Sequence, residues 1–319
     1  MARTLSSEVA GPDARAAARA DHPSRPAAIS FLVALRPEQW TKNLLVFAAL
    51  IFAEKLFDPA AVREAFAAFA IFCGLSSGIY LVNDIADRES DRRHPVKRRR
   101  PIAAGEISVG AAAAAAGVVG GGAIVGAFLL NKEFAFVAVG YAVLMLAYSA
   151  LLKHVVIIDA LTISVGFVLR AVAGATAIGV VISDWLFVCT ILLALFISLA
   201  KRRHEIVLLA DGATGHRRIL GEYTPALLDQ MIAVVAAATL IAYAFYTISP
   251  ETVAKFGTDR LELTLPFPLY GIFRYLYLVH RREGGGSPAD LLLNDRPLLG
   301  CVLLWAGTVV LIIYGSRLS

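Results

Sequence analysis

Charged residues are scarce in this chain. They make up 17% of its 319 residues, 58% are hydrophobic, and the mean hydropathy is +0.69. This composition excludes an ordinary soluble domain. Cysteine is scarce as well, and the three residues lie far apart in apolar stretches, where we expect packed thiols and no metal site. They are Cys73, Cys189 and Cys301.

The first 27 residues lack the apolar stretch that a cleavable signal peptide requires. They are polar and rich in Ala, Arg and Pro, a composition that predicts a disordered cytoplasmic tail. Residues 28–319 are predicted to form a single transmembrane domain.

The chain contains many long apolar segments. A helix needs roughly 20 apolar residues to cross a bilayer, and nine segments come close to this length. We therefore predict an all-α, polytopic membrane protein. The predicted spans are about 31–53, 62–85, 108–130, 133–151, 155–181, 184–209, 228–248, 265–281 and 297–316.

The cations predict the orientation of these spans. With a cytoplasmic N-terminus, 21 of the 30 Lys and Arg residues face the cytoplasm, six face the other side and three lie within predicted spans. The positive-inside rule then places the N-terminus inside and the C-terminus outside. The predicted cytoplasmic segments are 1–43, 86–107, 152–154, 201–227 and 282–296.

An acidic cluster lies at the cytoplasmic end of the second predicted span. If the helix continues at about 100° per residue, Asn83, Asp84, Asp87 and Asp91 fall within an arc of roughly 100°. Three carboxylates and an amide suit Mg2+, which a few carboxylates and substrate phosphates usually hold together. The alternative is a helix cap with surface ion pairs. Polar groups at the end of a membrane helix are costly without partners, which favours a site.

A cationic loop follows this cluster. His94 and Pro95 end the helix, because proline lacks the N–H and clashes with the preceding turn. His94 is expected to shape the turn, with a ligand role as the alternative. A basic loop also attracts anionic lipid, but this does not explain the interleaved carboxylates. The cations predicted to fold over a bound phosphate are Lys97, Arg98, Arg99 and Arg100.

A second charged group, with Lys201, Arg202 and Glu205, ends the sixth predicted span. A simple helical ion pair between Lys201 and Glu205 is one explanation. However, the two charged groups lie four spans apart, which indicates two four-helix halves plus one span. We predict that both groups line one central cavity.

Three further polar residues lie in or near the middle spans. Tyr148 can donate to a phosphate and Lys153 can neutralise one, but an interfacial aromatic and a snorkelling lysine are alternatives. Their spacing of five residues requires a break at the helix end if both point inward. Arg170 shares a helix face with Asp159 and lies deep enough to need a carboxylate or phosphate partner, in either a structural or a substrate-binding role.

Two glycine-rich segments have simpler interpretations. Close helix packing explains the glycines of the third predicted span, and loop 283–296 is expected to be a flexible connector, with a lid as the alternative. The glycines of the span are Gly117, Gly120, Gly121, Gly122 and Gly126.

Over residues 30–316 these motifs resemble the UbiA superfamily of intramembrane prenyltransferases. The resemblance is carried by the first acidic motif, by His94-Pro95 with the cations after it, by Tyr148-Ser149 with Lys153, and by Arg170-Ala171. It implies nine helices around a central cavity that is open to the cytoplasm and to lipid, with a Mg2+-bound diphosphate held by two aspartate-rich motifs.

The second motif departs from the superfamily pattern. Most members have paired aspartates where residues 201–205 are Lys-Arg-Arg-His-Glu. With the Arg-Pro-Glu-Gln-Trp-Thr-Lys-Asn segment at 36–43, the chain is similar to the branch of decaprenyl-phosphate phosphoribosyltransferases. That branch implies transfer of 5-phosphoribose from phosphoribosyl diphosphate to a polyprenyl phosphate, with release of diphosphate, for arabinan precursors of the cell envelope.

The resemblance also implies roles for the candidate residues. Mg2+ on Asn83, Asp84, Asp87 and Asp91 would stabilise the departing diphosphate, with Asp84, Asp87 and Lys201 as the catalytic residues. Lys201 and Arg202 would hold the ribose 5-phosphate. The full set of predicted substrate-binding residues is Lys42, Asn83, Lys97, Arg98, Arg100, Tyr148, Lys153, Arg170, Lys201, Arg202 and Glu205.

Two other functions stay open at this point. One is an ordinary UbiA-type transfer of a prenyl group from a prenyl diphosphate to an aromatic or other acceptor. The other is a transporter of phosphorylated metabolites. The expected location is the inner membrane of a bacterium, without a nucleic-acid partner, and the sequence predicts no oligomeric state.

Overall fold

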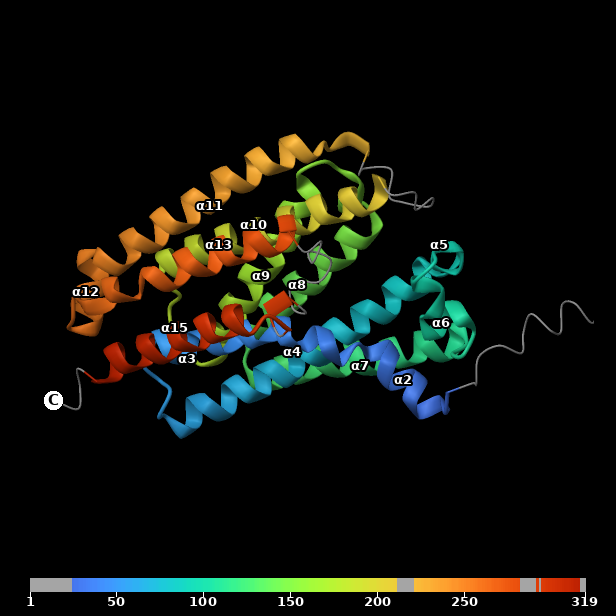
Figure 1. The fold of residues 1–319 in the computed structure, drawn as a ribbon. Helices are drawn as coiled ribbons and strands as arrows, with labels where there is room; N and C mark the ends of the chain where they lie inside the picture. Colours follow the sequence, from blue (N-terminus) through green and yellow to red (C-terminus); the bar gives the residue numbers. More distant parts are fainter. Residues whose placement is uncertain (1–24, 211–220, 282–290, 293, 316–319) are drawn as a thin grey trace, which may run out of the picture.

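The computed structural model describes residues 25–210, 221–281, 291, 292 and 294–315. Within these ranges every regular element is a helix, which confirms the predicted all-α class (Figure 1). Seven helices are long and apolar enough to cross a membrane. They are α4 (Pro59–Ala86), α7 (Val109–Leu130), α8 (Lys132–Ala150), α9 (Ile158–Ala177), α10 (Asp184–Ala210), α11 (Pro225–Ile248) and α15 (Arg296–Gly315).

The first predicted span is divided into three helices: α2 (Ala27–Leu35), the 3-10 helix η1 (Pro37–Phe47) and α3 (Ala48–Phe52). The division falls at Arg36, which has a positive φ of 54°. Proline disfavours the α conformation of the residue before it, so Pro37 explains why α2 ends there.

The eighth predicted span is α13 (Pro266–Arg281), a helix of 16 residues that is shorter than a usual membrane span. The predicted count of nine spans therefore stays a prediction, with seven found in the described part of the chain. The predictions for the tail before residue 25 and for most of loop 283–296 lie outside the described residues.

Short helices lie at the two ends of the bundle (Figure 1). The α5–α6 end carries α5 (Arg88–Arg93), η2 (Lys97–Arg99), α6 (Pro101–Ala104) and η3 (Leu152–His154). The opposite end carries α12 (Pro250–Phe256) and η5 (Arg260–Thr264). The described chain starts at the α5–α6 end and finishes at the opposite end, as an odd number of crossings requires.

The long helices form two groups that meet around α9. In one group α4 packs along α7 and α8 packs along α9; in the other, α10 packs against both α9 and α11, and α13 packs against α15. Tyr314 of α15 closes the bundle, because its hydroxyl donates to the Leu50 carbonyl and accepts from the Leu56 N–H, each at 3.1 Å. This arrangement agrees with two halves plus one extra helix.

The predicted close packing of glycines is confirmed at two positions. A Cβ on Gly78 would lie 2.9 Å from the Cα of Gly120, so α4 and α7 touch through their backbones there, and Gly126 lies against Ile71. The prediction is wrong for the other three glycines, which face open space: Gly117, Gly121 and Gly122.

Candidate active site

The acidic motif lies where α4 passes into α5. Asp87 separates the two helices, yet its N–H donates to the Asn83 carbonyl and its carbonyl accepts from the Asp91 N–H, each at 2.8 Å. These are α-helical hydrogen bonds, so the helical register continues through the junction as predicted. The structure therefore keeps Asn83, Asp84, Asp87 and Asp91 in one helical register.

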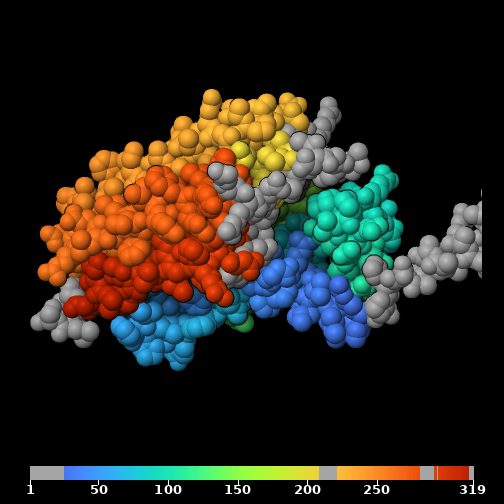
Figure 2. All heavy atoms as spheres, in the orientation of Figure 1, coloured from blue at the N-terminus to red at the C-terminus, as the bar shows by residue number. Residues whose placement is uncertain are grey.

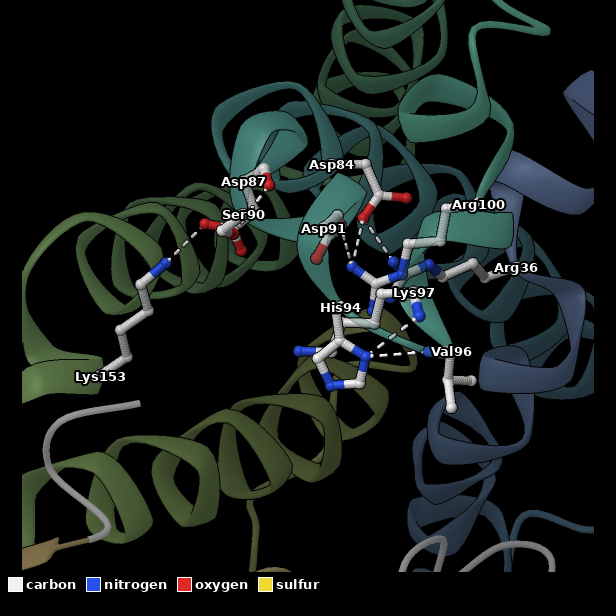
Figure 3. A network of polar contacts seen from close by, with 10 residues as sticks. All are labelled: Arg36, Asp84, Asp87, Ser90, Asp91, His94, Val96, Lys97, Arg100 and Lys153. Carbon is white, nitrogen blue, oxygen red and sulfur yellow. Dashed lines mark hydrogen bonds and ion pairs between the residues drawn. The ribbon is translucent and has the colours of Figure 1, made fainter. Parts of the chain in front are cut away.

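Two of these carboxylates share a cation from the following loop. Asp84 is 3% exposed and forms ion pairs with Arg36 and, at 3.1 Å, with Arg100. The same Nη1 atom of Arg100 lies 2.6 Å from Asp91, which is also buried. Arg100 thus folds back onto the two carboxylates, and Arg36 reaches Asp84 from the break between α2 and η1 (Figure 3). The predicted contact of Arg100 with a bound phosphate stays a prediction.

The rest of the cationic loop takes a different position. His94 shapes the turn, because its Nδ1 accepts the backbone N–H of Val96 at 3.1 Å and that of Lys97 at 3.2 Å. Arg98 is exposed and forms no ion pair with another described residue. The fold-back of the loop is thus seen at Arg100, while phosphate contacts by Lys97 and Arg98 stay predictions.

The third carboxylate points elsewhere. Asp87 pairs with Lys153 of η3 at 3.0 Å, on the side away from Arg100 (Figure 3). As a result, no three His, Cys, Asp or Glu side chains of the described chain converge where they could hold a metal ion. The predicted ligands share a helical register, but their carboxylates pair with cations from three different segments of the chain.

The donor atoms nevertheless suit Mg2+. Asn83 Oδ1 is buried without a hydrogen-bond partner among the described residues, an unfavourable state for an amide oxygen. Mg2+ prefers oxygen ligands and commonly takes one or two carboxylates together with substrate phosphates. Asn83 beside Asp84 and Asp91 meets that requirement without a closed cage of carboxylates.

Arg170 lies deeper, between α9 and η1. Its guanidinium donates to Asn43 Oδ1 at 2.8 Å, to the Tyr141 hydroxyl at 2.7 Å and to the Gly166 carbonyl at 2.9 Å. None of these partners is a carboxylate, so within the described chain neutral oxygens take that place, while a phosphate partner stays a prediction. A substrate-binding role for Arg170 stays a prediction that these contacts do not support.

Glycine permits the close contact between η1 and α9. A Cβ on Gly174 would lie 2.0 Å from the Val46 carbonyl oxygen, so no larger residue fits without a shift of the backbone. Asn43 then reaches Arg170 on one side and Ser76 of α4 at 3.3 Å on the other. These contacts fix the position of η1, the segment that carries Lys42, relative to α4 and α9.

Lys42 is partly buried and forms no hydrogen bond or ion pair with another described residue. The role of Lys42 as a ligand for a phosphate group therefore stays a prediction, which no contact within the described part of the chain tests.

The second motif is organised around Arg202, which is 3% exposed. Its Nε donates to Asp159 at 2.6 Å and its Nη2 to the Tyr148 hydroxyl at 3.2 Å, while Nη1 pairs with Glu205. The side chain that shares a face with Arg170, Asp159, is thus bound to Arg202 instead. Each of the three guanidinium nitrogen atoms already has a partner within the protein. The expected ribose-phosphate contact of Arg202 stays a prediction.

The neighbours of Arg202 complete this network. Lys201 Nζ lies 4.0 Å from Glu205 Oε1, so the simple ion pair between them is long. Tyr223 donates its hydroxyl to Asp159 at 2.9 Å. Burial raises the pKa of Tyr223 to about 12, so the hydroxyl keeps the proton that it donates.

The predicted helix-end break is confirmed. Helix α8 ends at Ala150 and η3 follows, so Tyr148 contacts Arg202 of the second motif while Lys153 contacts Asp87 of the first. These two side chains connect the motifs of the two halves at the α5–α6 end. The space-filling view shows a recess there, between the teal α5–α6 segment and the yellow end of α10 (Figure 2).

Sequence reasoning missed Arg36 and Tyr223 as partners of the two motifs. For Arg36 a signal existed in the sequence. A helix is expected to end at the residue before Pro37, and a cation next to an apolar segment is costly unless a carboxylate pairs with it. Tyr223 gave no such signal, because its contact with Asp159 joins residues that are 64 positions apart.

The fold and the site define a class: a polytopic helical membrane protein with an oxygen-rich, cation-lined site at one end of its bundle. The model of the UbiA prenyltransferase family matches residues 43–292, and the chain belongs to this family. The predictions of a UbiA-type fold and of an enzyme of this superfamily are thereby confirmed.

Characterised relatives extend over nearly the whole chain. It is 35% identical to the decaprenyl-phosphate phosphoribosyltransferase of Corynebacterium glutamicum over 92% of this chain and 89% of that protein. It is 34% identical to the protein of the same name from Mycolicibacterium smegmatis, over 89% and 92% of the two chains. A solved UbiA homolog from Archaeoglobus fulgidus, bound to GPP and Mg2+, superposes with a TM-score of 0.69 at 20% identity, over 89% of this chain and 99% of that one.

Proposed function

We propose that this protein transfers 5-phosphoribose from phosphoribosyl diphosphate to a polyprenyl phosphate and releases diphosphate. The relatives that cover most of the chain are named for a reaction of this class. The observation that carries the proposal is the second motif, where Arg202 binds Glu205 and Asp159 and, among the residues that the structure describes, leaves no pair of carboxylates for a second metal. A site with one acidic motif and added cations suits a donor with an extra phosphate.

In this proposal Asn83, Asp84, Asp87 and Asp91 hold Mg2+ together with the donor diphosphate. The bound ion would neutralise negative charge as the bond from C1 of ribose to the diphosphate breaks. Arg100 and Arg36 pair with Asp84, and Lys153 pairs with Asp87, so these cations lie within reach of the leaving group. Positive charge placed where negative charge develops is the main catalytic contribution expected of the protein.

The other predicted residues contact the donor and the acceptor. Lys201 binds the 5-phosphate, while Lys42, Tyr148 and Lys153 serve the acceptor phosphate or the leaving group. As the diphosphate departs, C1 gains oxocarbenium character, and an ionised oxygen of the polyprenyl phosphate attacks it. That oxygen carries no proton to remove, so no side chain has to act as a strong general base.

The test uses membranes that contain the full chain. Incubated with Mg2+, labelled phosphoribosyl diphosphate and decaprenyl phosphate, they should form a lipid-linked phosphoribose and an equal amount of diphosphate. Membranes with the Asp84→Asn variant provide the matched control. If wild-type membranes leave both substrates unchanged under these conditions, the proposal is wrong.

The second candidate is prenyl transfer to an aromatic or other acceptor, which the retained aspartate motif and the family assignment favour. The same membranes distinguish the two reactions when prenyl diphosphate and an aromatic acceptor replace the proposed substrates. Formation of a prenylated aromatic product, without any lipid-linked phosphoribose, would establish this second function.

We further propose that the chain lies in the inner membrane of a bacterium, with its N-terminus and site in the cytoplasm and its C-terminus outside. Cations concentrated in the predicted cytoplasmic segments support this orientation. The lipid product would then supply arabinan precursors for the cell envelope. Reporter enzymes fused to each terminus test the orientation: an N-terminal reporter should be active in the cytoplasm and a C-terminal one outside.

A further inference from the structure

Arg202 is a buried side chain whose three nitrogen atoms all have partners. Nε binds Asp159 at 2.6 Å, Nη1 binds Glu205 and Nη2 binds the Tyr148 hydroxyl at 3.2 Å. Asp159 is fully buried and receives a second hydrogen bond from Tyr223 at 2.9 Å. A buried pair with this many satisfied contacts has one geometry, since release of either partner leaves an uncompensated charge.

Glu205 is the end of this network that solvent reaches. Its side chain is 30% exposed, whereas those of Arg202 and Asp159 are 4% and 0% exposed. Arg202 engages Oε2, while Oε1 is directed toward Lys201, 4.0 Å away and beyond hydrogen-bonding distance. The network thus presents one carboxylate at a fixed orientation, beside the lysine that we assign to the 5-phosphate.

We infer that Asp159 and Arg202 are positioning residues that fix Glu205 as the acceptor for the ribose hydroxyls of the donor. This inference rests on the proposed function. A phosphoribosyl donor differs from a prenyl diphosphate by its hydroxyls as well as by its extra phosphate, and a carboxylate accepts hydrogen bonds from hydroxyls strongly. An acceptor built for hydroxyls rejects analogues that lack them, because the bound analogue displaces water from the carboxylate without replacing its hydrogen bond.

The test compares phosphoribosyl diphosphate with its 2-deoxy and 3-deoxy analogues, in wild type and in Glu205→Gln. Wild type should prefer the natural donor over at least one analogue by about a hundredfold or more in kcat/KM. In Glu205→Gln the donor KM should rise about tenfold or more, and the preference should fall at least tenfold, because the charged acceptor is gone. An unchanged preference in Glu205→Gln overturns the inference.

Asp159→Asn tests the positioning role. It should raise the donor KM and lower the preference in the same direction, and the double variant with Glu205→Gln should be no worse than the poorer single variant. Asp229→Asn is the matched control, because Asp229 also pairs with an arginine of α10 but outside this network. If Asp159→Asn does not fold, Tyr223→Phe replaces it, because it removes one hydrogen bond to Asp159 and keeps the ring.

The outcomes separate this inference from the function on which it rests. Wild type that makes no lipid-linked phosphoribose overturns both. An active wild type whose preference survives in Glu205→Gln overturns only the inference. A raised Mg2+ requirement in Glu205→Gln with unchanged preference also overturns it, since Glu205 would then be a metal ligand.

Discussion

The two charged regions of the site place their ion pairs differently. In the aspartate region, at the junction of α4 and α5, the carboxylates lie on one helix and their cations come from elsewhere in the chain. In the α10 region the cation Arg202 lies on the helix, and its main partner, Asp159, comes from α9. The cations that approach the aspartate region are Arg36, Arg100 and Lys153.

The arginine side chains of the two regions also differ in their exposure to solvent. Arg100 and Arg36 have side chains that are 28% and 20% exposed, so they can turn toward a phosphate while a metal takes over the carboxylates. Arg202 is 4% exposed and is bound to a fully buried Asp159. The aspartate region is therefore suited to exchange partners during a reaction, whereas the α10 region is suited to hold one geometry.

The largest effect is expected from Asp84→Asn. This change removes the buried charge that two arginines and the proposed metal share, so turnover should fall by about 1,000-fold even at saturating Mg2+. The measurement is release of diphosphate from phosphoribosyl diphosphate in membranes with equal amounts of folded protein.

The control for this variant is Asp184→Asn, an exposed acidic residue in the first turn of α10 at the opposite end of the bundle. It should keep wild-type turnover within about twofold, because exposed charges contribute little. Normal turnover by Asp84→Asn at saturating Mg2+ would falsify the exchange of partners that we assign to the aspartate region.

Much of the fold was predictable because its signals are local. Apolar runs located seven long helices, and Pro95 marked the end of α5. The first span failed as a single helix because Pro37 and Arg36 break it, a signal that its overall hydropathy concealed. Likewise, α13 has only 16 residues, so its apolar sequence alone did not determine whether it crosses the membrane.

The candidate site was predictable only in part, for a physical reason. Residues close in sequence, such as Asp84 and Arg100, were assigned to one region and do meet. Partners from distant segments were missed or misassigned: Asp159 was matched with Arg170 by helix periodicity, but it binds Arg202. Periodicity gives the face on which a side chain lies, while the opposing helix decides which charge it meets.

The next largest effect tests the α10 region. Lys201→Ala should raise the KM for phosphoribosyl diphosphate about ten- to a hundredfold with a smaller change in kcat. Lys201 is 39% exposed, and the phosphate that we propose it binds lies outside the reacting bond. Competition by ribose 5-phosphate provides a second measurement, and its inhibition should weaken in parallel. Unchanged donor KM and unchanged inhibition would remove Lys201 from the donor site.

A smaller effect is expected from the ion pair that joins the two halves. Lys153 and Asp87 lie 3.0 Å apart and are 12% and 35% exposed, so their coupling should be about 1 kcal/mol. Lys153→Ala should lower kcat/KM about tenfold, and Lys153→Arg should restore part of it. A double-mutant cycle with Asp87→Asn measures the coupling; strict additivity would show that the two residues act independently and that their ion pair has no role in catalysis.

The smallest effect should come from the neighbouring arginine of α10. Arg203 pairs with Asp229 of α11, which is 40% exposed and also lies 3.3 Å from His280 of α13. This pair is a surface contact away from Arg202, and such pairs contribute about 0 to 1 kcal/mol. Arg203→Ala should therefore change donor KM, kcat and analogue preference by less than about twofold. A tenfold rise in donor KM would mean that any positive charge on this part of α10 contributes to donor binding. The fixed geometry of Arg202 would then not distinguish the α10 region from the aspartate region.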